Sequence, residues 1–167
     1  LGGGTGPDVW LTTSSANGRF YRHAGGSCSP KCWSQVDVTG VTTPIRAVWG
    51  TANNDLWAVG NNGLILHNDG QSWSRSPYQR APVTAGSFYG GYGVANNPTS
   101  TVQFFGPADT AVNVDNTNIV PATGYSTTAQ QIYAAYGVAP NDIMVVGGNG
   151  VVLRYDGTSW KSIPSGT

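Results

Sequence analysis

Short runs of alternating apolar and polar residues follow one another along this chain. The clearest set covers residues 45–76, where IRAVWG, DLWAVG, LILHN and SWSRS are rich in β-branched and aromatic residues and are separated by Gly, Asn and Asp. Such runs between turn residues are typical of β-strands. No stretch keeps the periodicity of an amphipathic helix. The pattern therefore predicts an all-β protein made of short antiparallel strands.

The strand pattern repeats along the chain. VWGTANNDLWAVG (residues 48–60) aligns without a gap with AYGVAPNDIMVVG (residues 135–147), and GLILHNDGQSW (residues 63–73) aligns in the same way with GVVLRYDGTSW (residues 150–160). The N-terminal region gives a partial copy, and residues 89–119 give a weaker one. Four strands in a repeat of about 40–45 residues are the signature of a propeller blade.

We therefore expect one β-propeller domain of four-stranded antiparallel blades, because a single such sheet cannot bury both of its faces. The repeat units are expected at about residues 1–40, 41–80, 81–125 and 126–167. Leu1 aligns with Val48, inside the innermost strand of its unit, as though the first unit were cut. The four units either close as a small ring or form part of a larger propeller, and we favour the larger propeller.

The acidic residues recur at turn positions. Asp8, Asp55 and Asp142 each open the second strand of a unit, where a carboxylate can accept hydrogen bonds from turn N–H groups. Asp-Gly pairs at residues 69–70 and 156–157 lie between alternating strands, which is the strongest short-range signal for a hairpin. We interpret both sets as structural, with a ligand or metal role as the alternative for the first set.

Aromatic residues recur in register as well. They share three positions of the repeat: Trp33, Trp73 and Trp160 at the start of the outermost strand, Trp10 and Trp57 (with Met144) in the second strand, and Trp49, Tyr92 and Tyr136 in the innermost strand. Rings repeated in this way are expected to pack between neighbouring sheets. The alternative is a set of stacking surfaces for sugars, which only exposed rings could provide.

Composition and charge narrow the chemistry. Lys and Arg number 8 and form no cluster, the net charge is zero, and no apolar run approaches ~18 residues, so we expect neither a nucleic-acid partner nor a membrane span. All 8 acidic residues are Asp. A glycosidase needs two carboxylates, and only Asp37 and Asp109 lie off the recurring turn positions. His23 and His67 align one residue apart and project in opposite directions. We predict no catalytic residues, no metal and no cofactor.

Cys28 and Cys32 bound an inserted loop, CSPKC, in the hairpin between the third and fourth strands of the first unit. A Cys at each end of such a loop predicts a structural disulfide, which places the protein in an oxidising compartment. A redox pair would more often be CxxC at a helix start, and a metal site would need more ligands.

At these residues the chain resembles secreted bacterial propeller repeats with a consensus near VWGxxxxDVWAVGxxGxILHYDGxxWS. The DGxSW turn is also similar to the Asp-box hairpin of sialidase-type propellers, but Asn68 and Tyr155 stand where that box carries its Asp. The arginine triad and Glu of sialidases cannot be assembled here. The resemblance implies a propeller fold and a surface or extracellular location, and it implies no activity.

The functional prediction is a non-enzymatic extracellular binding or scaffolding module in a larger surface or filament assembly. Its partners would be other protein subunits, further copies of itself, or glycan. The longest non-repeating segments, residues 77–86 and 122–130, share one face of a propeller, and loops that break a repeat favour partner contact. Tyr78, Arg80 and Tyr125 are the candidate binding residues there, because Tyr and Arg are enriched at hot spots. The alternatives are a lectin-like sugar binder and, less favoured, an Asp-box-type glycoside hydrolase.

Overall fold

The computed structural model describes residues 8–13, 18–23, 25, 32–76, 87–93, 102–106, 111–114, 119–121, 131–139 and 141–166. These ranges contain β-strands and two short 3-10 turns, with no α-helix. The all-β prediction is confirmed. The strands are β1 (Val9–Thr12), β2 (Arg19–His23), β3 (Ser34–Asp37), β4 (Ile45–Ala52), β5 (Asp55–Gly60), β6 (Ile65–Asn68), β7 (Trp73–Arg75), β8 (Gly90–Gly93), β9 (Val102–Phe105), β10 (Ala111–Val114), β11 (Ile119–Pro121), β12 (Ile132–Ala139), β13 (Asp142–Gly147), β14 (Val152–Tyr155) and β15 (Trp160–Ser162).

The strands form four separate antiparallel sheets, each of which follows the chain as a meander. The first sheet has the order β1-β2-β3, the second β4-β5-β6-β7, the third β8-β9-β10-β11 and the fourth β12-β13-β14-β15. We expected four strands in each unit, and three sheets have them. The expected innermost strand of the first unit falls at Leu1, outside the described residues. The boundaries proposed for the repeat units stay a prediction.

The second and fourth sheets share one hydrogen-bonding register. Their first two strands pair Trp49 with Trp57 and Tyr136 with Met144 at corresponding places, and each pair of strands carries two bulges at the same two positions. A 3-10 turn follows in each sheet, at Asn61–Gly63 and Gly148–Gly150, with its central Asn at a φ of 56° or 53°. Asn tolerates this left-handed conformation better than most side chains. The pattern of alternation and turn residues therefore determines local geometry in both sheets.

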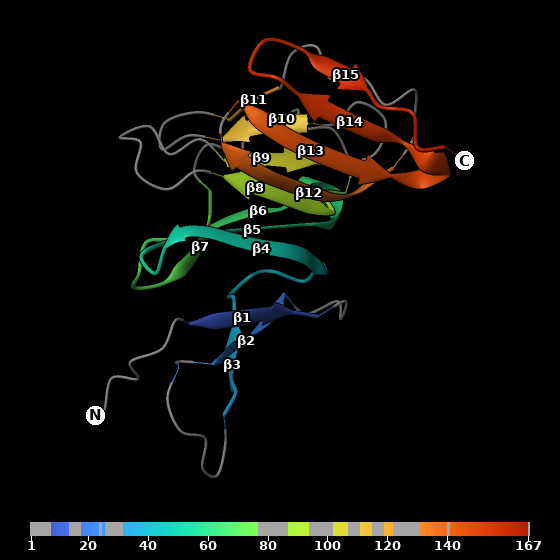
Figure 1. Cartoon of the computed structure of the whole chain (residues 1–167). Coiled ribbons are helices and arrows are strands. Elements are labelled where there is room, and N and C mark those ends of the chain that lie inside the picture. The colour runs from blue at the N-terminus through green and yellow to red at the C-terminus, as the bar shows by residue number, and fades with distance from the viewer. Residues whose placement is uncertain are drawn as a thin grey trace.

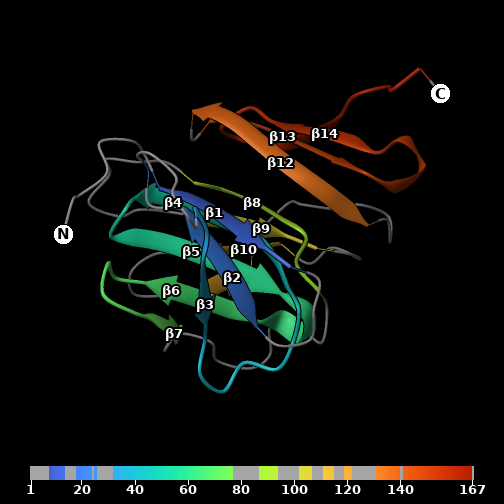
Figure 2. The same ribbon diagram turned by 90° about the horizontal axis from the view of Figure 1, so that it is seen from below.

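Consecutive sheets pack face to face in chain order. Figure 1 shows this succession from β1–β3 to β12–β15, and Figure 2 shows it along the stack. Phe20 of β2 is buried against Ala58 and Leu66 of the second sheet. The opposite face of the second sheet, with Trp57, packs on Phe88, just before β8. The core is therefore a series of layers, one at each junction between sheets.

At each of the last two junctions the packing extends to the first strands of the two sheets, where an aromatic ring of one strand covers a glycine of the next. Strand β8 contacts both β4 and β12. The rings of Trp49 and Tyr92 lie 6.2 Å apart, and they occupy the space in which a Cβ at Gly93 or Gly137, respectively, would stand. Gly90 likewise lets β8 approach the Ala134 backbone, since a Cβ there would lie 3.2 Å from the Ala134 Cα. Glycine at these places allows the close approach of neighbouring first strands.

Candidate functional site

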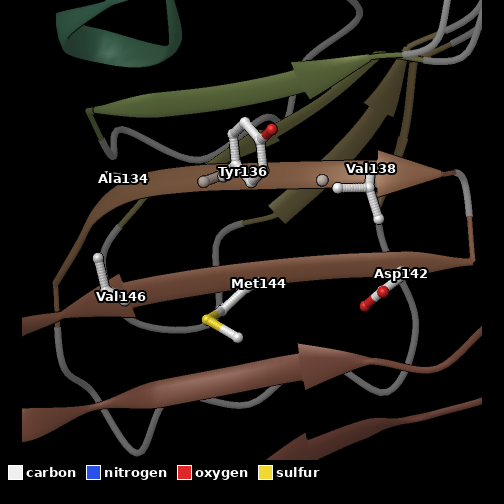
Figure 3. Close-up of a pocket in the computed structure, with 8 residues that line it drawn as sticks. Ala134, Tyr136, Val138, Asp142, Met144 and Val146 are labelled. Carbon is white, nitrogen blue, oxygen red and sulfur yellow. The ribbon is translucent and has the colours of Figure 1, made fainter.

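The fourth sheet presents an apolar hollow of about 320 Å³ on the face that points away from the third sheet. Alternation along β12 and β13 puts Tyr136, Val138, Met144 and Val146 on this face, and all four side chains are exposed (Figure 3). The full lining is Ala134, Ala135, Tyr136, Gly137, Val138, Asp142, Met144 and Val146. We call the face carrying these residues the β12–β13 face.

A pair of charged groups, Asp142 and Arg154, borders this apolar surface. The Arg154 guanidinium on β14 donates through Nε to Asp142 Oδ1 at 2.8 Å and through Nη2 to Asp142 Oδ2 at 3.1 Å. This two-point contact holds the pKa of the Asp142 carboxyl below its usual value and raises the pKa of Arg154. Asp142 is the one acidic residue among the eight that line the hollow. Its charge is therefore committed to a structural pair at the rim.

The same pair recurs in the first two sheets. Arg22 donates from Nε to Asp8 at 2.9 Å, and His67 Nε2 lies 2.9 Å from an oxygen of Asp55. In each case the basic side chain reaches diagonally across the strand pair to the Asp that precedes or opens the neighbouring strand. The structural interpretation of these acids is supported. We expected turn N–H groups as donors. The structure instead pairs these carboxylates with basic side chains of the following strand, and Asp55 also accepts the indole N–H of Trp57 in its own strand.

In the first two sheets the basic side chain of each pair also packs on the recurring Trp of the second strand. The guanidinium carbon of Arg22 lies 5.6 Å from the centroid of the Trp10 ring, and His67 stacks on Trp57 with ring centroids 4.2 Å apart. His67 thus belongs to the face of Trp57, while His23 pairs with Val9 on the other face of its sheet. The two histidines point to opposite faces, as the alignment predicts.

The Asp-Gly turns have the predicted role. Asp69 accepts the N–H groups of Gln71 and Ser72 at 2.9 and 3.0 Å, and Asp156 accepts those of Thr158 and Ser159 at 3.0 and 2.9 Å. These hydrogen bonds lower the pKa of Asp69; at Asp156 the ammonium of Lys161 is the larger cause, with the turn N–H groups second. Both carboxylates stabilise hairpins.

The sequence-predicted binding residues Tyr78, Arg80 and Tyr125 lie outside the described residues. Cys28 does too, so the Cys28–Cys32 disulfide stays a prediction. Within the described ranges, no three His, Cys, Asp or Glu side chains come together as a metal site would require.

Sequence reasoning missed the β12–β13 face as a surface. Tyr136 and Met144 were interpreted as packing residues because they align with Trp49 and Trp57. That alignment is correct as to position, since the cross-strand pairs match. The difference is that the third sheet covers Trp57, whereas no described sheet covers Met144. The residue pattern of one unit does not show whether another sheet lies over it. The exposed surface follows from the place of this sheet at the end of the stack.

Comparison with known proteins adds no family. Neither the family models nor the curated proteins to which the chain was compared match it. No helix in the described part of the chain is long and apolar enough to cross a membrane.

Proposed function

We propose that this chain is a non-enzymatic β-propeller module that binds other macromolecules outside the cell, as a scaffold within a larger surface assembly. The propeller proposal is supported by meandering sheets that pack in chain order, with the first strands β4, β8 and β12 in successive contact. In this account the sheets are blades of a propeller larger than these four units, because a ring closed by the four alone would bury the exposed β12–β13 face. The extracellular location rests on the predicted disulfide and on the resemblance to secreted repeats.

The single observation that carries the binding function is the exposed apolar surface of the β12–β13 face. Contiguous exposed apolar patches mark interaction sites in soluble proteins. Here four large apolar side chains from two adjacent strands share one face, and the hollow between them is about 320 Å³. A protein surface with complementary apolar groups is the partner that this face fits best.

Hydrolysis has less support. An Asp-box-type glycosidase needs two carboxyl groups facing one cleft. The hollow has one, at Asp142, and two hydrogen bonds from Arg154 hold it. That carboxyl has a lowered pKa, which is the opposite of what a general acid requires. The proposal therefore includes no catalytic residue and no cofactor.

A lectin-like role is the second candidate, favoured by the exposed ring of Tyr136. Sugar-binding repeats would offer one such ring in each sheet. Trp49 and Tyr92 hold the corresponding places, and both are partly buried beside each other. A glycan array tests this role directly: binding that is lost in Tyr136→Ala would favour the lectin over the scaffold.

The binding function is tested by photo-crosslinking in cells that produce the chain. A benzophenone amino acid replaces Tyr136 on the β12–β13 face, and the same group at Ser162 of β15 serves as the matched exposed control. We expect covalent protein adducts from position 136 and none from position 162. Absence of adducts at position 136, with the variant folded, contradicts the proposal.

A further inference from the structure

In the described part of the chain, most exposed large apolar side chains lie at the two ends of the stack of sheets. Among the described residues there are eight, and all but Tyr133 belong to two faces. Tyr136, Val138, Met144 and Val146 form the β12–β13 face. The others are Val9, Leu11 and Trp33 on the first sheet. The ring centroids of Trp33 and His23 lie 5.3 Å apart, and His23 pairs with Val9. Val9, Leu11 and Trp33 therefore share the outer side of that sheet, here called the β1–β3 face.

The internal junctions show what each end face lacks. Trp73 stacks on Phe20 of the preceding sheet, with ring centroids 4.4 Å apart. Trp160 packs edge-on against Phe105 of the preceding sheet, with ring centroids 5.6 Å apart. Trp33 has the same place in the first unit and is 40% exposed, at the end of the stack where no earlier sheet is described. The β1–β3 face therefore carries the aromatic residue that elsewhere joins one sheet to the sheet before it.

The second strands give the same comparison. Ile143 and Val145 of β13 are buried in one cluster with Phe105 of the third sheet. Val9 and Leu11 hold the corresponding places in β1, one and three residues after the recurring Asp, and they are 46% and 49% exposed. These side chains fit the side of a sheet that receives a predecessor.

The β12–β13 face has the opposite character. Trp57 and Val59 of β5 are buried against Phe88 at the junction with the third sheet. Met144 and Val146 hold their places in β13 and are 42% and 41% exposed. This face fits the side of a sheet that receives a successor, and the β1–β3 face resembles the surfaces that the second and fourth sheets turn toward the sheet before them.

We propose that a second copy of this chain docks its β1–β3 face on the β12–β13 face of the first, continuing the stack head to tail. Trp33 of the second copy would cover Val146 and Met144, as Trp160 covers Phe105 inside the chain. The contact is heterologous, so two copies close into a ring or further copies extend it. A net charge of zero opposes neither outcome. The inference rests on the proposed binding function of the β12–β13 face and names its occupant.

The test uses two variants that each block one face. Leu11→Asp places a carboxylate on the β1–β3 face, and Val146→Asp places one on the β12–β13 face, opposite Val152 and away from Arg154. Ser162→Asp, on the exposed strand β15, is the matched control. Molar mass is measured by size-exclusion chromatography with light scattering over a concentration series. Circular dichroism and thermal melting check that each variant is folded.

We expect the unmodified chain and Ser162→Asp to have the mass of two or more copies at high concentration. Each blocking variant alone should be monomeric, with a dissociation constant raised by about 100-fold or more, because the junction would desolvate a charge. An equimolar mixture of the two blocking variants should form a heterodimer and nothing larger, since one complementary pair of faces stays intact.

Three results would overturn the inference: a monomeric unmodified chain at every concentration, association unaffected by both substitutions, or a mixture in which no heterodimer forms. The first of these leaves the proposed binding function standing if position 136 still crosslinks to a different protein. Loss of crosslinking as well would remove both.

Discussion

Because the core is layered, truncating residues at the same position of the repeat should change the free energy of unfolding by different amounts. The change should be large where another sheet covers the side chain and small where the side chain is exposed. Phe105 is the last residue of β9 and is fully buried between the third and fourth sheets, against Ile132, Val145 and Trp160 among others. Truncation to Ala removes most of a buried ring from a junction that two sheets share. We expect Phe105→Ala to lower the free energy of unfolding by about 3–5 kcal/mol, the range for buried Phe.

The matched control is Val146→Ala. Val146 precedes Gly147 in β13 as Phe105 precedes Gly106 in the third sheet, but its side chain is exposed. We expect a change within about 0.5 kcal/mol for this variant. Both are measured by guanidinium unfolding with tryptophan fluorescence, at concentrations where light scattering gives a monomer. Similar costs at the two positions would refute the layered packing.

Three further predictions concern turns, charge and the predicted disulfide. Gly70→Ala should lower the free energy of unfolding by more than about 1 kcal/mol in urea, because φ is +91° and the new Cβ would lie 2.7 Å from that of Asn54; Gly40→Ala, with a φ of +76° and open space, should cost less. Arg154 lowers the pKa of Asp142 in the folded state, so this pair contributes to stability above the unfolded-state pKa of about 3.9 and the contribution is lost as pH falls through the folded-state pKa. Asp142→Asn should therefore flatten the fall in melting temperature below about pH 4. An unchanged profile contradicts this. Reduction of the Cys28–Cys32 disulfide should lower the free energy of unfolding, measured by calorimetry, by about 2 kcal/mol. The reductant should not change the stability of a control chain in which both cysteines are Ser.

The strands of the second and fourth sheets could be predicted closely from the sequence. Apolar alternation and Asp-Gly turns are local signals, and β5 (Asp55–Gly60) and β13 (Asp142–Gly147) coincide with the runs that the alignment identifies. The hairpins follow because the carboxylates of Asp69 and Asp156 cap their own turns. These features depend on residues close together in the chain.

The parts that sequence reasoning missed depend on the register between strands and on which sheet lies over a given face. The pairing of Asp142 with Arg154 requires the register of β13 on β14, which brings Met144 opposite Arg154. The exposure of Met144 requires knowledge of the sheet that would lie over it, and its alignment with the buried Trp57 gives no sign of the difference. Burial is a property of the junction, and each junction joins two units.

The central claim is that consecutive sheets pack face to face in chain order through their recurring rings. A solution nuclear Overhauser spectrum tests it most directly. The account predicts cross-peaks between the rings of Phe20 and Trp73, whose centroids lie 4.4 Å apart, and between Phe105 and Trp160, at 5.6 Å. A spectrum with the cross-strand peaks of each sheet intact, but without either of these contacts between sheets, would contradict it.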